Sequence, residues 1–502
     1  MAEEPDSIQK EFANRLLKKV ARGGGIAFVG RVLKKGLGFV LQITLGRFLG
    51  PAAYGLYSLG TNLLNLAGKI SLLGLQNGLI RFVSLHRGED DKRKLTGVIR
   101  LSLGAGVLFS SAVGFVLFIF SGYISEGIFG EPGLVKLVQV FALFLPVSVL
   151  VALLKSTLRG FQNMRHFVFV QLARAGGNIL FILGSFLLGF RLYGAVGGFL
   201  ISMSAAALFG VYLLYLNSPE FFQKTKTIIQ PKKLFRFSLP MYLAGFSYLI
   251  MSRTDIFMLG FFMNSDDVGI YRAAVSIAVL ANFALVAFNQ AFAPMLSDLF
   301  NKDRLEEIQK LYTTVTRWGF VLSSELVLLM ILFSTELLGV FGEEFKAGWK
   351  ALIILAVFQL VAVSVGSVDI LLQMSGNQDY VLINNVATAV LNVGLNFWLI
   401  PIFGIVGGGL ATGISIAFNN LAGLVEVYIL KGLQPWDISF LKLSVIVLAS
   451  GSFYPIFYVF NLPWYVGIFL IGGLFVLLLY LFGLTEEEIV IIRAVKRKMD
   501  TN

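Results

Sequence analysis

The stretch LGPAAYGLYSL (49–59) returns in altered form as NSDDVGIYRAA (264–274). Within these stretches, Gly55-Leu56-Tyr57 aligns with Gly269-Ile270-Tyr271, at an offset of 269 − 55 = 214 residues. Short glycine-containing turns also resemble one another by chance, so a second marker at a similar offset is needed before a repeat is predicted.

That second marker is the pair YGAVGGFL (193–200) and FGIVGGGL (403–410), at an offset of 403 − 193 = 210 residues. Two markers at nearly the same offset predict two copies of one unit, in residues 26–216 and 238–430. Each copy holds six apolar segments. Because six is even, both copies enter the membrane from the same side and are parallel repeats, whose interface commonly holds the substrate site.

The composition places the chain in a membrane. It has 502 residues, of which 57% are hydrophobic and 14% charged, whereas soluble domains are about 45–50% apolar and about 25% charged. A water-soluble enzyme of this length is therefore excluded. There is no Cys and there are only two His, so the sequence predicts no disulfide, no metal site and no catalytic triad, and the protein is not expected to be an enzyme.

The sequence predicts an all-α polytopic membrane protein with about 14 transmembrane helices, as two parallel six-helix repeats plus an extra C-terminal helix pair. The predicted spans are 26–48, 54–80, 98–120, 134–157, 167–189, 194–216, 238–262, 268–293, 317–335, 349–373, 380–401, 405–430, 440–460 and 464–484. The predicted domains are a cytoplasmic N-tail (1–25), an N-terminal lobe (26–216), a cytoplasmic linker (217–237), a C-terminal lobe (238–430), a two-helix hairpin (440–484) and a cytoplasmic amphipathic tail (485–502).

Loop charge sets the orientation. Lys and Arg gather in alternate loops and in both tails, and 41 Lys+Arg against 29 Asp+Glu give a net charge of +12. Cytoplasmic loops that face anionic lipid explain this excess without a nucleic-acid partner. We therefore expect both termini in the cytoplasm and the protein in the plasma membrane. No cleavable signal peptide is visible in the first 22 residues.

Polar stripes inside the spans carry the functional signal, because charge within a membrane is costly. Helical spacing brings basic and amide side chains onto common faces of the first, second and fifth spans. The substrate-binding candidates are Arg31, Lys34, Lys35, Gln42, Asn62, Asn65, Lys69, Arg174 and Arg253. With no acidic residue in the first six spans, these cations predict an anion-binding cavity. The alternative is that long basic side chains extend to the cytoplasmic interface, which the sequence favours for Lys155 and Arg159.

The second half has uncharged stripes instead. Asn and Thr side chains on 380–401 and Thr, Ser and Asn side chains on 405–430 could bind sugars or hold two helices together, and the sequence does not decide between these roles. The candidate Na⁺ or H⁺ coupling sites are Asp255, Asp369 and Glu426. Structural pairing with a nearby cation is the competing role for each of them.

The chain resembles the polysaccharide-biosynthesis (Wzx-type) flippases of the MOP superfamily, which also includes the MATE exporters. The resemblance covers roughly 24–484 and rests on LGRFLGPAAYGLYSL (45–59), LRGFQNMRHFVFVQLARAGGNIL (158–180) and FSLPMYLAGFSYLIMSRTDIFMLGFFMNSDDVGIYRAA (237–274). It implies two six-helix lobes around a central cavity. It also implies a lipid-linked oligosaccharide substrate on a polyprenyl (pyro)phosphate carrier. A clear carboxylate cluster for ion coupling is absent from the sequence.

We therefore predict a flippase that moves this anionic lipid-linked glycan from the cytoplasmic to the outer leaflet by alternating access, with no cofactor beyond a coupling ion. Its partners would be membrane lipids and glycan polymerase or assembly proteins. A MATE-like exporter of organic cations is the alternative, although it requires acidic cavity residues. A membrane-embedded glycosyltransferase would require acidic residues in an outer loop, and the loop near 49–55 has none.

Overall fold

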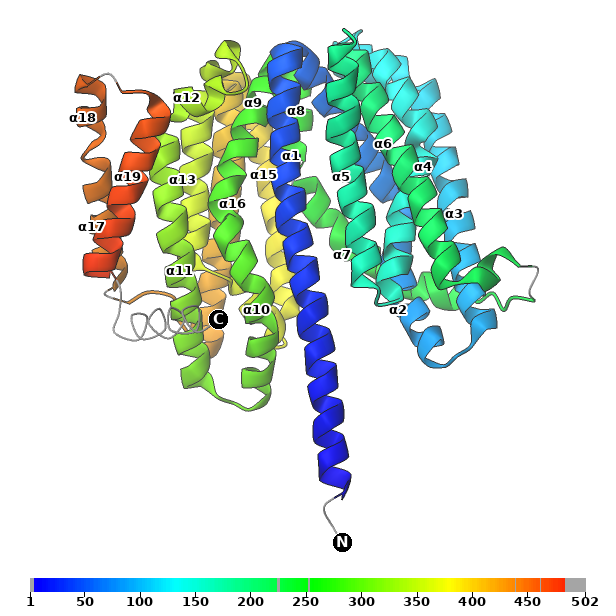
Figure 1. Ribbon diagram of the computed structural model, residues 1–502. Coiled ribbons are helices and arrows are strands. Elements are labelled where there is room, and N and C mark those ends of the chain that lie inside the picture. Colours follow the sequence, from blue (N-terminus) through cyan, green and yellow to red (C-terminus); the bar gives the residue numbers. More distant parts are fainter. Residues whose placement is uncertain (1–3, 224–225, 252, 438, 461, 484–502) are drawn as a thin grey trace. The chain divides into compact units, whose positions relative to one another are not determined.

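The computed structural model describes residues 4–223, 226–251, 253–437, 439–460 and 462–483, and these ranges form helices and no strands (Figure 1). Ten helical segments of the described chain are long and apolar enough to cross a membrane. The other four predicted spans fall on α1, α7–α8 and α17–α18, which is why the count of 14 stays a prediction. The predicted class, an all-α polytopic membrane protein, is confirmed.

The described chain forms two compact units, Met1–Gly269 and Ile270–Asn502. The first contains α1 (Glu4–Leu72), α2 (Leu75–Gly88), α3 (Lys92–Ile119), η1 (Tyr123–Ile128), α4 (Leu134–Gly160), α5 (Met164–Leu187), α6 (Leu192–Asn217), η2 (Pro219–Phe222), α7 (Pro231–Met251), α8 (Thr254–Phe262) and the start of α9 (Ser265–Ala278). The second contains the rest of α9, then η3 (Val279–Asn282), α10 (Phe283–Asn301), α11 (Leu305–Leu332), α12 (Ser334–Gly339), η4 (Glu343–Gly348), α13 (Trp349–Val365), α14 (Val368–Met374), α15 (Gln378–Phe403), α16 (Ile405–Lys431), α17 (Ser439–Gly451), α18 (Tyr454–Val459), α19 (Trp464–Leu478) and η5 (Leu479–Gly483).

Helix α1 carries the first two predicted spans and bends between them. Gly50 has φ 73° and ψ 173°, a conformation that glycine adopts without the steric cost of a Cβ, and Pro51 follows it. The predicted span 54–80 is not one continuous helix. It is broken at Leu73 and Gly74, whose φ values of 43° and 75° end α1 before α2 begins.

Close helix contacts hold each unit together. In the first unit, α3 packs on α4 and α5 on α6, while α1 packs on both α4 and α5. In the second, α13 and α15 both pack on α16, and α11 packs on α13. Small residues permit these contacts: a methyl group on Gly114 would lie 2.5 Å from the Ala142 carbonyl oxygen, and one on Gly407 would lie 2.1 Å from the Leu399 carbonyl oxygen.

The two glycine turns marked by the sequence repeat have the same local role. The first leads into α6, where a methyl group on Gly198 would lie 2.8 Å from the Ile182 nitrogen of the preceding helix. The second leads into α16, with Gly407 against Leu399. The compact units divide at residue 269, after α8, whereas the predicted second repeat begins at 238. Packing and sequence similarity define different boundaries, so the repeat limits stay predictions.

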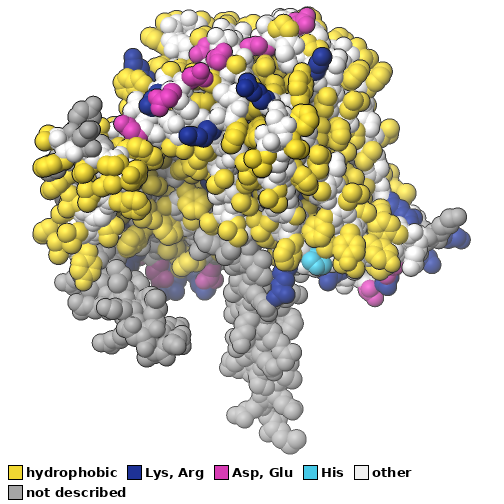
Figure 2. Space-filling view, turned by 45° about the horizontal axis from the view of Figure 1, so that its top comes forward, with side chains coloured by type: hydrophobic (Ala, Val, Ile, Leu, Met, Phe, Trp, Pro, Cys, Tyr) yellow, Lys and Arg dark blue, Asp and Glu magenta, His cyan; other side chains and the backbone are white. Residues whose placement is uncertain are grey.

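Large hydrophobic side chains cover much of the surface. Figure 2 shows them over most of the visible face, with charged side chains in its upper part and along its lower edge. Leu187 is 87% exposed and Phe469 79% exposed. A soluble protein would bury such residues, so this surface fits a lipid environment. The predicted amphipathic tail (485–502) lies outside the described residues.

Candidate functional site: a basic cluster on α1, α4 and α5

Arg174 of α5 lies close to aromatic side chains within the first unit. Its guanidinium carbon is 5.6 Å from the centre of the Phe199 ring on α6. The Phe199 ring in turn contacts Tyr57 and Phe141 edge to face, with ring centres 6.3 and 5.9 Å apart. A guanidinium above a ring keeps its planar edge available for a bidentate contact with an anion.

Three lysines lie within electrostatic range of this arginine or of one another. Lys155 of α4 is coupled to Arg174, Lys34 and Lys69, and Lys34 is also coupled directly to Arg174. Lys34 and Lys69 both belong to α1, before and after its bend. Helices α1, α4 and α5 therefore bring four cations together, which we call the basic cluster: Lys34, Lys69, Lys155 and Arg174.

The basic cluster has no anion of its own in the described part of the chain. None of its four members has a described carboxylate within 4.0 Å, although ion pairs form elsewhere, as between Lys92 and Glu220. Lys155 and Arg174 are half-buried, whereas Lys34 and Lys69 are exposed. The repulsion among the four charges is therefore strongest at the two half-buried members, where less water screens it. Such a cluster favours an anionic ligand, and phosphate oxygens suit both the arginine and the lysines.

Lys155 is the member that the sequence analysis assigned to the interface instead of the site. It is half-buried and lies within electrostatic range of the other three cations, which favours a place in the cluster over the interface role. The sequence did contain an indication of this role, because Lys155 lies on the same helix face as Ser148. Lys155 lies near the predicted cytoplasmic end of its span, where long side chains usually reach the interface. A role in the site was therefore not predicted for it.

The other predicted first-half residues have varied surroundings. Lys35 is exposed beside Lys34, and Asn65 is exposed on α1. The Tyr54 hydroxyl donates a hydrogen bond to Gln42 Oε1, and Asn62 Nδ2 donates to the Ser58 carbonyl oxygen at 2.7 Å. The side chain of Arg31 lies outside the described residues. Sugar binding by these amides stays a prediction.

Arg253 and Asp255 lie at the start of α8. Arg253 is half-buried at the N-cap, and Asp255 is 6% exposed in the first turn. The Asp255 carboxylate accepts a hydrogen bond from the Ile256 N–H at 2.8 Å. A carboxylate in a first helical turn is stabilised by the helix dipole, which gives Asp255 a structural role besides the predicted one.

The uncharged stripes of α15 and α16 bond to each other. Thr388 Oγ1 donates to Asn419 Oδ1 at 3.1 Å, and Asn392 Nδ2 donates to Ser415 Oγ at 3.3 Å. All four residues are buried. Of the two roles left open by the sequence, these four side chains have the one of holding two helices together.

Two predicted coupling-ion residues meet in the second unit. Asp369 of α14 is within electrostatic range of Glu426 of α16. Asn384 Nδ2 of α15 donates to Glu426 Oε2 at 2.7 Å, while Asp369 Oδ1 is buried without a described partner. Among the described residues, no group of three or more His, Cys, Asp or Glu could hold a metal ion. The structure instead shows a pair of carboxylates, Asp369 and Glu426. The Asn384 amide is hydrogen-bonded to Glu426.

The sequence analysis overlooked Glu325, although a charge within the predicted span 317–335 is itself a signal. Glu325 of α11 is 7% exposed and accepts a hydrogen bond from Ser450 Oγ of α17 at 3.2 Å. On the same helix, Arg317 donates to the Gly483 carbonyl oxygen at 2.5 Å. These two contacts attach the C-terminal helices to α11.

The chain is similar to known families of membrane proteins. The model of a family described as "Polysaccharide biosynthesis protein" matches residues 20–300, and the MatE model matches residues 240–398. A protein of Haloferax volcanii described as a low-salt glycan biosynthesis flippase is 23% identical over 86% of this chain and 89% of its own length. A Shigella flexneri protein described as an O-antigen transporter is 24% identical over 75% of this chain and 90% of its own.

Among solved structures, the lipid II flippase MurJ in an inward-closed conformation is similar in fold. Its TM-score is 0.70 at 16% sequence identity, covering 90% of this chain and 97% of that one. At this identity the likeness concerns the fold alone. The first family model covers more than half of the chain, and the helices and apolar surface described above agree with it. The chain belongs to the polysaccharide biosynthesis protein family of MATE-like membrane proteins.

Proposed function

We propose that this protein is a flippase that moves an oligosaccharide linked to polyprenyl phosphate or diphosphate from the cytoplasmic to the outer leaflet. The observation that carries the proposal is the basic cluster of Lys34, Lys69, Lys155 and Arg174, which has no described carboxylate partner. Two curated relatives are described as a glycan biosynthesis flippase and an O-antigen transporter, which supports this substrate class.

The chemistry of the cluster matches a diphosphate head group. The Arg174 guanidinium can form two parallel hydrogen bonds with one phosphate, while the lysines act as point charges toward the other oxygens. Each hydrogen bond to a charged group contributes about 1.5–3 kcal/mol, so the loss of one contact lowers affinity roughly 10- to 100-fold. The glycan and the lipid tail are carried along without any covalent change.

A MATE-like exporter of organic cations is the second candidate. Its substrate would be repelled by four uncompensated cations, and the described acidic pair, Asp369 and Glu426, lies in the other compact unit. The MatE model matches only residues 240–398. The sign of the charge in the first unit therefore favours an anionic substrate.

We place the protein in the plasma membrane with both termini in the cytoplasm, as the loop charges predict. Coupling to Na⁺ or H⁺ through Asp369 and Glu426 is part of the proposal. Membrane lipids are its immediate surroundings, and glycan polymerase or assembly proteins are its proposed partners.

A flipping assay in liposomes tests the proposal. A fluorescent polyprenyl-diphosphate disaccharide serves as substrate, and Lys34, Lys69 and Lys155 are each changed to Ala. We expect each change to slow transport, with Lys136→Ala as the control because Lys136 is an exposed lysine near the other end of α4. Undiminished transport in all three variants would contradict an anion-binding role. A prenol-linked disaccharide that lacks phosphate should not be transported.

A further inference from the structure

A pocket of about 780 Å³ lies in the first unit, where α2 ends and α7 begins. Its walls are four basic residues and a few apolar ones, and it shares no residue with the basic cluster. The basic residues are Arg81, Lys232, Lys233 and Arg236. The apolar residues that the argument uses are Phe82, Leu85 and Phe237.

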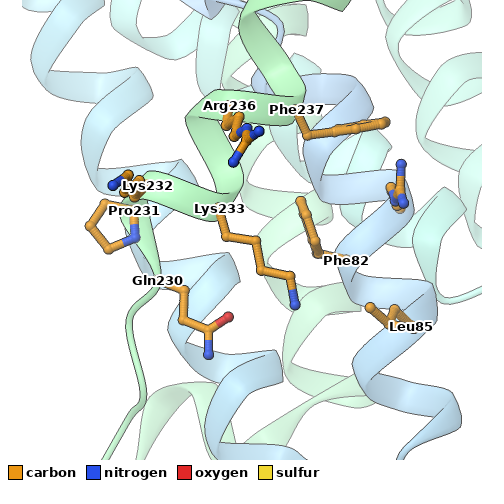
Figure 3. Close-up of a pocket in the computed structure, with 9 residues that line it drawn as sticks. Phe82, Leu85, Gln230, Pro231, Lys232, Lys233, Arg236 and Phe237 are labelled. Atoms are coloured by element: carbon orange, nitrogen blue, oxygen red, sulfur yellow. The ribbon is translucent and has the colours of Figure 1, made fainter.

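The cations and rings of this pocket face one another across the two helices. Figure 3 shows Phe82 and Leu85 on α2, opposite Lys233, Arg236 and Phe237 on α7. The Arg81 guanidinium carbon is 4.4 Å from the centre of the Phe237 ring, and Lys233 Nζ is 5.8 Å from the centre of the Phe82 ring. The aromatic rings fix the stems of the basic side chains and leave their charged ends available.

The four charges of the pocket have no anionic partner among the described residues. All four side chains are exposed, and none has a described carboxylate within 4.0 Å. Pro231 is the first residue of α7, so the positive end of that helix dipole also lies in the wall. The pocket is thus strongly electropositive and open to a ligand.

We propose that this pocket is an accessory site for an anionic phospholipid of the cytoplasmic leaflet. The four cations would bind the phosphate head group, and the apolar wall of Phe82, Leu85 and Phe237 would contact the start of the acyl chains. An amphiphile fits better than a free anion, because cations alone would suffice for inorganic phosphate. The site goes beyond the proposed transport function, since it binds a lipid that is not moved.

The position of the pocket agrees with such a ligand. Six of its lining residues, between Gln230 and Phe237, belong to the basic segment 217–237, which the loop charges predict at the cytoplasmic surface. That leaflet carries the anionic lipids, and each basic residue near its surface strengthens the attraction roughly fivefold. A phospholipid bound here would attach the start of α7 to α2.

The test compares the wild type with a Lys232→Gln/Lys233→Gln/Arg236→Gln variant in neutral detergent. The probes are phosphatidylglycerol, phosphatidylcholine, inorganic phosphate and polyprenyl diphosphate. Native mass spectrometry measures retained lipid, and a thermal unfolding scan measures stabilisation. We expect phosphatidylglycerol, and not phosphatidylcholine or phosphate, to be retained and to raise the unfolding midpoint of the wild type by several degrees.

In the triple variant, apparent affinity for phosphatidylglycerol should fall roughly 100-fold. The control is Arg159→Gln/Arg165→Gln/Lys226→Gln, which removes three exposed charges outside the pocket and should bind as the wild type does. If the triple variant does not fold, Lys233→Gln alone should lower affinity about fivefold. Unchanged binding in the pocket variants, or equal loss in the control, overturns the proposal.

The remaining arms separate the possible sources of phosphate. If inorganic phosphate bound as tightly as phosphatidylglycerol, the apolar wall would contribute nothing to affinity. That result overturns the lipid assignment. Loss of polyprenyl diphosphate binding with phosphatidylglycerol binding intact would make the pocket a substrate site instead. Because lipid retention is measured without transport, its failure is distinguishable from a failure of the flipping assay.

Discussion

Gly55 and Gly269, the two glycines aligned by the sequence repeat, lie against each other in the first compact unit. A methyl group on Gly55 would be 3.1 Å from the Gly269 nitrogen and 1.7 Å from the Ser265 carbonyl oxygen. A methyl group on Gly269 would be 2.1 Å from the Pro51 carbonyl oxygen. The bend of α1 and the start of α9 therefore approach at backbone distance, which only glycine allows at both positions.

Gly55→Ala should consequently destabilise the first unit. The obstructing atom is a backbone oxygen that cannot rotate away, and overpacking of this kind costs about 1–3 kcal/mol. Fluorescence-detected size exclusion after heating should show a midpoint lower by several degrees. Gly104→Ala is the control, because a methyl group there meets nothing within 4 Å. Equal midpoints for the two variants would contradict the close approach.

Lys155→Gln should weaken substrate binding about as much as Lys69→Gln does. Both lysines belong to the basic cluster, and loss of one charged contact lowers affinity roughly 10- to 100-fold. The measurement is the concentration of polyprenyl-diphosphate disaccharide that half-saturates transport in liposomes. Arg159→Gln, one helical turn further along α4, should leave this concentration unchanged. The interpretation of Lys155 as an interface residue would return if the two α4 variants behaved alike.

The dependence of transport on an ion gradient should disappear in Asp369→Asn and Glu426→Gln. The two carboxylates lie within electrostatic range of each other, and the Asn384 amide donates to Glu426 alone, so neutralising either carboxylate changes the affinity for a cation between them. Transport is measured with imposed Na⁺ and H⁺ gradients in turn. Glu325→Gln is the matched variant, as it neutralises another buried carboxylate of the same unit. Loss of gradient dependence in that variant alone would move the coupling site to Glu325.

The turn after α6 should be less stable at low pH. Glu220 Oε1 is 2.7 Å from Lys92 Nζ, and the hydrogen bond from Lys92 holds the pKa of the Glu220 carboxyl below its ordinary value of 4.5. A depressed carboxyl pKa contributes stability above pH 4.5 that is lost as the pH falls through the folded value. The effect is small because both side chains are partly exposed.

The measurement is the difference in unfolding midpoint between the wild type and Glu220→Gln across a pH series. The difference should be constant near neutral pH and shrink toward zero below pH 4.5. A difference that grows on acidification would have the wrong sign for this ion pair. Glu126→Gln is a control for nonspecific charge effects, because Glu126 is exposed on η1 and its carboxyl has no described side-chain partner.

The sequence alone determined the all-helical membrane class, most of the helices and the basic character of the first half. Apolar length and helical periodicity are properties of single segments, so they can be read without knowledge of neighbours. It also identified Lys34, Lys69 and Arg174, because an intramembrane cation is conspicuous on any one helix.

Only the tertiary structure decided which polar residues meet. It joined Lys155 to the basic cluster, paired Thr388 with Asn419 across α15 and α16, and brought Asp369 near Glu426. Each of these outcomes depends on how two helices are rotated against each other, and that rotation is set by the packing of both surfaces together. A stripe on one helix therefore shows that polar atoms need a partner, while the neighbouring helix determines whether that partner is another side chain or a ligand.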